Sequence, residues 1–416
     1  MSTPATPTPP RPPQPLSADA LQLAFAEACR VHAAGRLEEA RAQYRSLLGY
    51  LPESALLHYN VGLVCYALRE FDQALLAFSL AATYGPEDAD TLFNLALCQK
   101  KTGDHPAAIA TYLQILAACP DHVDSLYNLG GCYSTVRDEA RSMDCYHRVL
   151  AVQPGYHPAA NNLAYLYHRA GEIDQAIHYY SQVLELRPED ESVRHMLASL
   201  LGVTPEHAPD AYVRDFFDAY AEGFEHSLVE ELGYDNPRRL CECLCKSKAQ
   251  PAVYAHGLDL GCGTGLSGLS FKALITVLDG VDLSRQMLAQ AAQKGCYAVL
   301  HPDSILHYLD ATAETYDFFL ATDVFIYVGE LLDVFTSAHA VARPQALFCF
   351  STEHLDAGGY QLMQTGRFAY SHAYIRSIAA ATGWIVLALE PTRLRKERET
   401  WIAGDLWVFQ LGPAIA

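Results

Sequence analysis

A glycine-rich turn followed by an acidic residue is the part of this sequence whose residue types and spacing point most directly to chemistry. The turn is Leu258-Asp259-Leu260-Gly261-Cys262-Gly263-Thr264-Gly265, directly after a short apolar run. Glycine tolerates positive φ and, lacking a Cβ, lets the backbone approach a ligand closely. Residues 266–274 are expected to form a helix whose free N–H groups face the turn. A strand, a glycine turn and a helix in this order predict a site for a nucleotide-like ligand.

Asp282 is spaced to complete such a site. It ends a second apolar run, residues 274–282, and an acidic residue about 20 positions after the glycine turn binds ribose hydroxyls in this arrangement. The glycine pattern is Gly-x-Gly-x-Gly, with Leu266 where the dinucleotide fingerprint needs a glycine. A NAD site and a purely structural turn remain alternatives on these residues alone.

The turn resembles motif I of class I S-adenosylmethionine (SAM) methyltransferases, and Val281-Asp282-Leu283-Ser284 resembles their second motif. The resemblance implies an α/β Rossmann-like domain with SAM as its cofactor. It implies that the cofactor is bound by Asp259, Gly261, Cys262, Gly263, Thr264, Gly265, Asp282, Leu283, Asp303, Asp323 and Tyr220.

Four of these aspartates follow separate predicted strands. Further strands are expected within residues 297–300, 316–327 and 346–351, and a final antiparallel pair at 384–390 and 405–411. Ligands bind beyond the carboxyl ends of parallel strands, and Asp259, Asp282, Asp303 and Asp323 all fall at such ends. The pattern predicts a mostly parallel seven-stranded sheet with a C-terminal antiparallel hairpin.

Three residues are candidates for a general base, which an oxygen or nitrogen acceptor can require. Asp323 lies in a segment that resembles motif IV of the same enzymes. His354 follows the fifth predicted strand, and His372 lies in a segment, residues 366–374, expected to cross the acceptor side. A polar loop role is the alternative for each histidine. The family tends to place histidine where this chain has Tyr370, and Arg367 is a candidate anchor for a carboxylate or phosphate.

The N-terminal half repeats itself with a period of 34 residues. The repeating positions are Pro52, Pro86, Pro120, Pro154 and Pro188; Ala40, Ala74, Ala108, Ser142 and Ala176; Tyr44, Phe78, Tyr112, Tyr146 and Tyr180; and Ala28, Gly62, Ala96, Gly130 and Ala164. This pattern resembles the tetratricopeptide repeat (TPR), with five helical hairpins over residues 21–190 and a capping helix over 191–202. Small residues let paired helices approach, and proline ends each second helix because it has no N–H.

A fifth register consists of Asn60, Asn94, Asn128 and Asn162. In TPR arrays this position faces the concave groove, where an asparagine can donate to and accept from an extended peptide. This row of four asparagines, the asparagine ladder, resembles the one that lines the groove of O-GlcNAc transferases. It predicts a protein or peptide partner. The alternative is that each asparagine only satisfies a neighbouring repeat.

Charge and cysteine usage exclude several classes of function. The net charge of −19 argues against a nucleic-acid substrate, and no apolar run reaches the ~18–20 residues of a membrane span. The twelve cysteines show no disulfide-scaffold spacing, which indicates reduced thiols in a cytoplasmic protein. Cys241-x-Cys243-x-Cys245 lacks the usual zinc-ligand spacing, so no metal site is expected.

The segment of residues 212–224 resembles an aromatic helix that is found in a bacterial family of TPR-containing class I methyltransferases and closes over SAM. Tyr220 and Phe224 are its candidates here, and Glu225 replaces the family's second aspartate. Residues 1–17 are expected to be a disordered Pro-rich leader, 18–203 the TPR array and 204–416 the methyltransferase domain. The implied function is methyl transfer to an unidentified acceptor, with the array recruiting a partner or substrate. The alternative is a TPR scaffold whose SAM domain is a sensor or is inactive.

Overall fold

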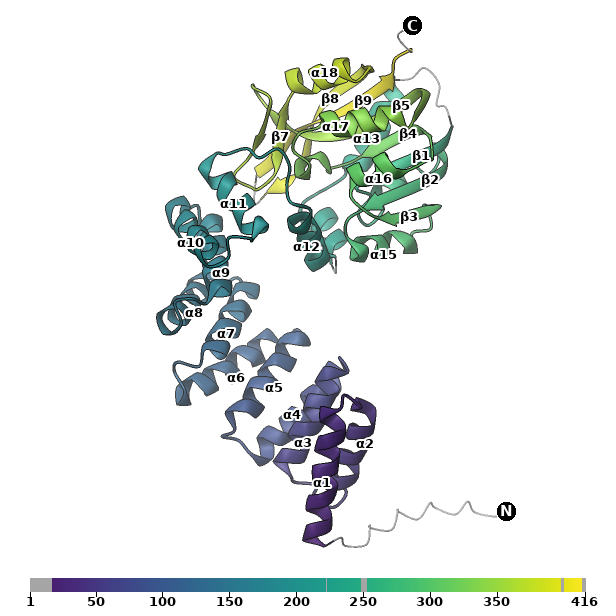
Figure 1. The fold of residues 1–416 in the computed structure, drawn as a ribbon. Coiled ribbons are helices and arrows are strands. Elements are labelled where there is room, and N and C mark those ends of the chain that lie inside the picture. The colour runs from purple at the N-terminus through teal and green to yellow at the C-terminus, as the bar shows by residue number, and fades with distance from the viewer. Residues whose placement is uncertain (1–16, 222, 248–252, 398–399, 414–416) are drawn as a thin grey trace, which may run out of the picture. The chain divides into compact units, whose positions relative to one another are not determined.

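The computed structural model describes residues 17–221, 223–247, 253–397 and 400–413, with the side chains of 219, 220, 227 and 231 left out. The predicted leader therefore lies outside the described residues, apart from Ser17. The chain divides into two compact units, Met1–Gln182 and Val183–Ala416 (Figure 1). The domain boundary predicted between residues 203 and 204 stays a prediction.

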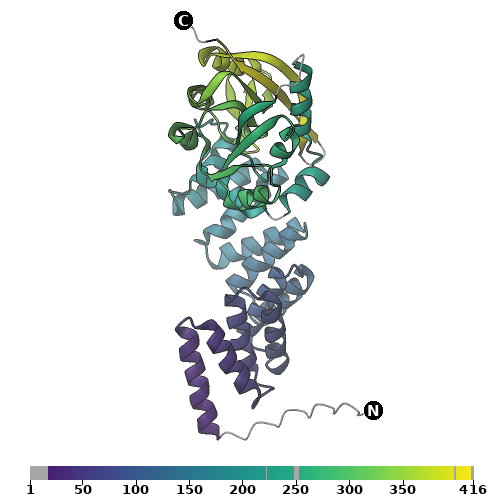
Figure 2. The ribbon, with the colours of Figure 1, turned by 90° about the vertical axis from the view of Figure 1, so that its right-hand side faces the viewer.

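The N-terminal unit is built of helical hairpins in which sequence neighbours pack together (Figure 2). Its helices are α1 Ala18–Ala33, α2 Leu37–Leu48, α3 Ala55–Ala67, α4 Phe71–Tyr84, α5 Ala89–Lys101, α6 His105–Ala118, α7 Val123–Thr135, α8 Glu139–Val152, α9 His157–Ala170 and the first part of α10 Ile173–Leu186. The five pairs match the predicted repeats.

Close packing within each hairpin explains two of the repeated positions. A Cβ on Gly62 of α3 would lie 2.6 Å from the ring of Phe78 on α4, and one on Gly130 of α7 would lie 2.8 Å from Tyr146 on α8. The aromatic side chain thus packs against the small residue of its own hairpin. A larger residue in the first helix would force the two helices apart.

The turns inside the hairpins adopt left-handed backbone conformations. Gly35, Gly103 and Gly171 have φ of 75°, 83° and 80°. Arg69 and Arg137, which take the glycine's place in the second and fourth repeats, have φ of 63° and 62°. The two arginines therefore keep the backbone conformation of the glycines. They do so although a Cβ clashes with the backbone in the left-handed conformation and disfavours it.

The C-terminal unit contains a nine-stranded sheet whose main path runs β3-β2-β1-β4-β5-β7-β6, with β9 pairing β5 and β8 pairing β9. The strands are β1 Tyr254–Leu260, β2 Ile275–Asp282, β3 Val299–Pro302, β4 Tyr316–Ala321, β5 Ala342–Leu355, β6 Tyr360–Leu362, β7 Phe368–Ser371, β8 Trp384–Glu397 and β9 Thr400–Leu411. Strands β1 to β5 are parallel, and β8 and β9 form the predicted antiparallel hairpin. The short strands β6 and β7 are additions to the predicted seven.

Helices cover both faces of this sheet, as Figure 1 shows. The helical segments are α11 Glu191–Leu201, α12 Asp210–Tyr220, the π-helix η1 His226–Glu231, α13 Asn236–Ser247, α14 Leu266–Phe271, α15 Arg285–Gln293, α16 Ile305–Ala311, the 3-10 helix η2 Phe325–Tyr327, α17 Leu332–Ala340 and α18 His372–Ala381. A hydrophobic core lies on each face of the sheet. In β5, Phe348 and Phe350 point into the core beneath α17 and α18, and Leu347 and Cys349 point into the other core, beneath α13. The same alternation places the side chains of Glu353 and His354, further along β5, on opposite faces of the sheet.

Helix α11, predicted as a cap for the repeats, packs on the C-terminal unit. His195 is buried, and its Nε2 lies 2.9 Å from the carbonyl oxygen of Gly366. The hydroxyl of Ser199 donates to the carbonyl of Gln364 over 3.5 Å. These contacts position the loop that precedes β7.

Candidate functional site

The glycine turn adopts the conformation predicted for it. It joins β1 to α14, and Gly261, Gly263 and Gly265 have φ of 65°, 53° and 91°. A Cβ on Gly261 would lie 2.7 Å from Val324 Cγ2, whereas one on Gly263 would meet nothing within 4 Å. Gly261 is therefore required for packing, and Gly263 leaves open space beside the turn.

Asp282 at the end of β2 is held by backbone donors. Its Oδ2 accepts from the N–H of Gly263 over 2.9 Å, and its Oδ1 accepts from the N–H of Ser284 over 2.8 Å. Burial raises the pKa of Asp282, and these two hydrogen bonds oppose the rise. A carboxylate offers about four acceptor positions, so Asp282 retains capacity for a ligand.

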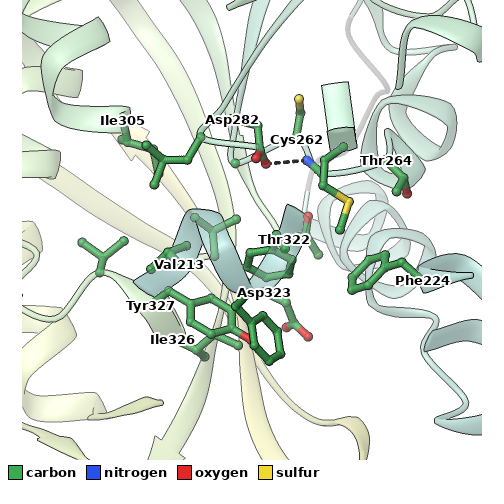
Figure 3. A pocket seen from close by; sticks show the side chains of 18 of the residues that line it. Val213, Phe224, Cys262, Thr264, Asp282, Ile305, Thr322, Asp323, Ile326 and Tyr327 are labelled. Atoms are coloured by element: carbon green, nitrogen blue, oxygen red, sulfur yellow. Dashed lines mark hydrogen bonds between the residues drawn. The ribbon is translucent and has the colours of Figure 1, made fainter. Parts of the chain in front are cut away.

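A cavity of about 620 Å³ lies beyond the carboxyl ends of the strands, within the range of ~300–1,000 Å³ common for small-molecule sites. Figure 3 shows Asp282, Cys262 and Thr264 on one side and Asp323, Ile326 and Tyr327 on the other. The predicted cofactor-binding residues that line it are Gly261, Cys262, Gly263, Thr264, Asp282, Leu283, Asp303 and Asp323. The structure thus brings these residues together around one space.

Two predicted residues lie behind this lining rather than in it. Asp259 is fully buried, and its Oδ2 accepts from the hydroxyl of Tyr297 over 2.7 Å. Its Oδ1 has no hydrogen-bond partner among the described residues. Burial raises the pKa of Asp259 to about 7. Gly265 is also absent from the lining residues, and a Cβ there would lie 3.0 Å from the Tyr297 ring.

Aromatic residues from the segment of α12 and η1 line the opposite wall of the cavity. Phe216, Phe217 and Phe224 line it together with Tyr327, and the ring centroid of Phe217 lies 5.2 Å from that of Tyr327 and 5.9 Å from that of Phe224. Phe224, one of the two residues expected to close over the cofactor, thus lines the cavity. The side chain of Tyr220, the other candidate, lies outside the described residues.

Polar contacts attach this wall to α15. Ser284, the N-cap of α15, donates its hydroxyl to Asp218 Oδ1 over 2.5 Å. Glu225 pairs with Lys294 at 2.6 Å, and Gln290 donates to the carbonyl of Ala221. Glu225, which departs from the family's aspartate, therefore still provides a carboxylate for an ion pair.

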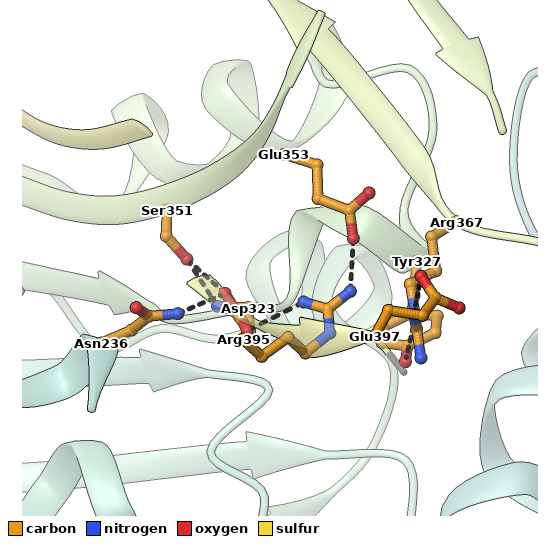
Figure 4. A network of polar contacts seen from close by, with 8 residues as sticks. All are labelled: Asn236, Asp323, Tyr327, Ser351, Glu353, Arg367, Arg395 and Glu397. Carbon is orange, nitrogen blue, oxygen red and sulfur yellow. Dashed lines mark hydrogen bonds and ion pairs between the residues drawn. The ribbon is translucent and has the colours of Figure 1, made fainter. Parts of the chain in front are cut away.

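Asp323 occupies a strained position at the exit of β4, with φ of 58°. Figure 4 shows the donors that converge on it. Its Oδ1 accepts from Asn236 Nδ2 over 3.1 Å and from the Ser351 hydroxyl over 2.9 Å, and its Oδ2 pairs with Arg395 at 3.1 Å. The second amino group of Arg395 binds Glu353. The network fixes Asp323 as a negative charge at the cavity wall.

Arg367, the candidate anchor, also lines the cavity. Its Nε donates to the Tyr327 hydroxyl over 3.2 Å, and its guanidinium lies 3.8 Å from Glu397 (Figure 4). Tyr370, found where the family has histidine, is buried. Its hydroxyl contacts the carbonyls of Phe325 and Gly329 and therefore pins the loop after β4.

Asp303 borders the cavity at the end of β3 and accepts from the Ser304 N–H over 2.8 Å and from His307 Nδ1 over 2.7 Å. His354 and His372 are not among the residues that line it. Both rings instead approach Asp405. Sequence reasoning did not connect Asn236, Glu353 and Arg395 with Asp323, since the signal is spread over four elements.

The asparagine register lies along the first helices of the repeats. The side-chain amides of Asn60, Asn94 and Asn128 donate to carbonyls four residues earlier over 2.8, 2.8 and 2.9 Å. Asn128 Oδ1 accepts from Lys100 Nζ over 3.1 Å, and Asn162 is hydrogen-bonded to Tyr146. Much of the donor capacity of this register is thus used within the array.

Models of two kinds of known domain match different parts of the chain. A model of a methyltransferase domain matches residues 258–348. Models of the tetratricopeptide repeat match residues 158–190, 25–89 and 66–123. The chain therefore combines tetratricopeptide repeats with a methyltransferase domain, which implies a methyl donor.

A human protein, methyltransferase-like protein 27, is 32% identical over 144 residues, which make up 33% of this chain and 56% of that protein. The chain thus spans about half the length of this relative. Two solved structures are similar to part of this chain. MamA from Desulfovibrio magneticus is 18% identical, with a TM-score of 0.40 over 42% of this chain and 98% of its own. YrrB, described as having an unusual peptide-binding site, is 18% identical, with a TM-score of 0.39 over 41% of this chain and 89% of its own.

Within the described ranges, none of the helices has the length and apolarity needed to span a bilayer.

Proposed function

We propose that this protein is a class I SAM-dependent methyltransferase. The observation that carries the proposal is the pairing of Asp282 with the N–H of Gly263 at the wall of a cavity of about 620 Å³. The methyltransferase domain matched over residues 258–348 contains both residues. Their contact joins the two segments that resemble the family's cofactor motifs.

The residues around the cavity fit a nucleoside-bearing cofactor. Asp282 keeps free acceptor positions for ribose hydroxyls, and the missing Cβ of Gly263 leaves space for a ligand close to the backbone. Leu283 supplies an apolar surface and Asp303 a carboxylate at the same wall. These residues and the backbone of 261–265 would hold SAM.

SAM, when bound, supplies a methyl group on a sulfonium, a strong electrophile that transfers in line to a nucleophile. The protein's contribution is to position the acceptor and exclude water. Asp323 presents a fixed negative charge, because donors from Asn236, Ser351 and Arg395 hold both its oxygens. The aromatic wall around Phe217 would exclude water from a bound ligand on its side of the cavity.

Asp323 suits an electrostatic role better than proton abstraction, because taking a proton would disrupt its contact with Arg395. His354 and His372 face Asp405 rather than the cavity, so the proposal assigns neither as the base. Arg367 lines the cavity and can contact a carboxylate or phosphate of the acceptor. The acceptor is left open to experiment.

The TPR array is proposed to recruit a protein or peptide partner. The matched repeats support this role. The asparagine side chains would act chiefly as acceptors, because the amides of Asn60 and Asn94 already donate to their own helices. We expect Asn60→Ala with Asn94→Ala to weaken binding of the recruited partner, whereas unchanged affinity would refute the ladder.

Calorimetry with SAM tests the cofactor site. We expect Asp282→Ala to abolish measurable binding. Asp317→Ala is the matched control, because Asp317 also accepts two backbone N–H groups, from Ala255 at 2.8 Å and His256 at 2.9 Å, yet does not line the cavity. Equal affinity of the native protein and Asp282→Ala would disprove the assignment.

The acceptor is sought with methyl-labelled SAM in host extract, with Asp282→Ala as background. Label on a protein would identify the array as the arm that recruits substrate. Label in small molecules would keep the enzyme and make the array a scaffold. SAM binding without label in any fraction would favour the alternative function, a TPR scaffold with a SAM sensor.

A further inference from the structure

Two histidines and a buried aspartate meet on the C-terminal unit, outside the cavity lining. His354 Nδ1 lies 2.7 Å from Asp405 Oδ2, and His372 Nε2 lies 2.9 Å from the same oxygen. The potential ligand atoms of the three side chains lie within 4.8 Å of one another. Two imidazole nitrogens thus converge on one carboxylate oxygen.

Sheet pairing brings these residues together from three elements. Asp405 on β9 lies opposite Thr352 of β5, and His354 lies two residues further along β5, on the same face as Thr352. His354 also pairs with Tyr370 of β7, and β7 leads directly into His372 at the start of α18. The positions of all three side chains are therefore set by the sheet and not by a mobile loop.

The carboxylate of Asp405 needs a cation or hydrogen-bond donors, because its side chain is only 1% exposed. His354 Nδ1 supplies one hydrogen bond to this carboxylate at 2.7 Å, but the contact with His372 supplies no second one. Although His372 Nε2 is buried and close to Asp405, it has no hydrogen-bond partner of acceptable geometry within the described part of the chain. An unprotonated ring nitrogen facing a carboxylate oxygen would be repulsive, and a positive ion bound by both would remove the repulsion.

We propose that His354, His372 and Asp405 bind a divalent transition-metal ion of the zinc type. Two imidazoles and one carboxylate are a common protein ligand set for such ions. The side chains of His354 and His372 are 30% and 35% exposed, which leaves a fourth position for water. A tetrahedral ion with bonds of about 2.0–2.2 Å holds its ligand atoms roughly 3.3 Å apart. Both histidine nitrogens must therefore move about half an ångström away from Asp405 Oδ2.

Asp356, whose side chain is fully exposed, lies on the outer side of the site. Its Oδ1 lies 3.4 Å from His354 Nε2. Histidines that bind metals commonly present their second ring nitrogen to a carboxylate, which orients the ring and fixes the tautomer. With the ion bound, a proton on Nε2 would leave the lone pair of Nδ1 for the metal, in place of the present hydrogen bond to Asp405.

This site is independent of the proposed cofactor site. Glu353, next to His354, points to the opposite face of β5 and binds Arg395 in the network around Asp323. The ion would therefore join β5, β9 and α18 behind the cavity without contacting a ligand in it. Its binding can be measured without any methyl-transfer assay.

Titration of the full-length, chelator-treated protein with Co²⁺, followed by visible absorption, tests the proposal. We expect one equivalent to bind and His372→Gln or Asp405→Asn to weaken affinity by at least about tenfold. His339→Gln is the matched control, because His339 is a partly buried histidine whose Nδ1 lies 2.7 Å from the Thr382 carbonyl. Equal binding by the native protein and both site variants, or no binding by the native protein, would overturn the site.

X-ray absorption of the zinc-loaded native protein gives a second test that does not depend on variants that fold. Two imidazole ligands with the remaining positions occupied by oxygen are expected. Sulfur ligands would place the ion at cysteines such as Cys241 and Cys245, and would refute the proposal.

Discussion

Three aspartates around the glycine turn have different surroundings and therefore different expected properties. Asp282 accepts two backbone hydrogen bonds at the cavity wall. Asp323 is bound by Asn236, Ser351 and Arg395. Asp259 lies behind the turn with a single hydroxyl donor. These surroundings distinguish the proposed ligand contact, a carboxylate held by three donors, and a buried group whose pKa is raised.

Asp259 is expected to make stability depend on pH. Because burial raises its pKa from 3.8 to about 7, the folded state holds the proton more tightly than the unfolded state. Its contribution to the free energy of unfolding is therefore present below pH 3.8 and is lost as the pH rises to about 7. Urea unfolding across this range should show a smaller decline for Asp259→Asn than for the native protein. Identical slopes would contradict the expectation.

Arg69 and Arg137, whose backbones adopt the left-handed conformation, allow the cost of backbone strain to be measured at single residues. Arg69→Gly should stabilise the array by about 0.5–1 kcal/mol, because relief of a left-handed Cβ clash of about 1–2 kcal/mol exceeds the entropy cost of glycine of about 0.5–1 kcal/mol. The reverse change, Gly103→Arg at φ of 83°, should destabilise it by a similar amount. Denaturant unfolding measures both, and changes of the same sign would refute the strain argument.

At the scale of elements, the aromatic wall of the cavity depends on contacts between α12 and α15. The hydroxyl of Ser284 both caps α15, by accepting from Met287 N–H over 3.1 Å, and donates to Asp218 of α12. The Ser284 side chain thus links the start of α15, directly after Asp282, to α12, which forms part of the aromatic wall.

We expect Asp218→Ala to weaken SAM affinity several-fold with little change in melting temperature, because it releases α12 without altering α15. Ser284→Ala should also lower stability by about 1 kcal/mol through the lost cap. Asp215→Ala is the control, since Asp215 is an exposed residue of α12 paired with Arg214. Calorimetry and thermal unfolding separate the two effects. Full affinity in Asp218→Ala would show that the contact does not hold the wall.

For the whole molecule, the division into two compact units predicts at which residues the chain can be truncated without loss of the C-terminal unit. The division falls between Gln182 and Val183, so α11 belongs to the C-terminal unit. Its Met196 packs so closely on the loop before β7 that a Cβ on Gly366 would lie 2.8 Å from the methionine sulfur. The loop therefore relies on a helix that the repeat pattern assigned to the array.

A chain that starts at residue 188 should bind SAM like the full-length protein, whereas one that starts at residue 204 should melt at a lower temperature. The reason is that the shorter chain lacks the contacts of His195 and Ser199 with residues 364–366. Thermal unfolding and calorimetry of both chains test this. Equal melting temperatures would show that α11 contributes nothing to the unit. Loss of partner recruitment by either chain is expected, because both lack the array.

The sequence alone determined the features that depend on local patterns. The 34-residue period predicted five helical hairpins, and the glycine turn with Asp282 predicted the strand-turn-helix unit and its partner strand. The repeats can be predicted from sequence because their packing positions recur at a fixed interval. The turn can be predicted because its backbone conformation requires glycine at particular positions. The methyltransferase and TPR regions were both predicted in this way.

Tertiary structure decided the contacts between residues that are far apart in the chain. Arg395 reaches Asp323 across 72 positions, and His354 meets Asp405 across 51. No periodicity connects such residues, since strand order and register bring them together. The packing of α11 on the loop before β7 and the addition of β6 and β7 have the same origin. Local spacing encodes each element, but only the assembled sheet determines which side chains from different elements meet.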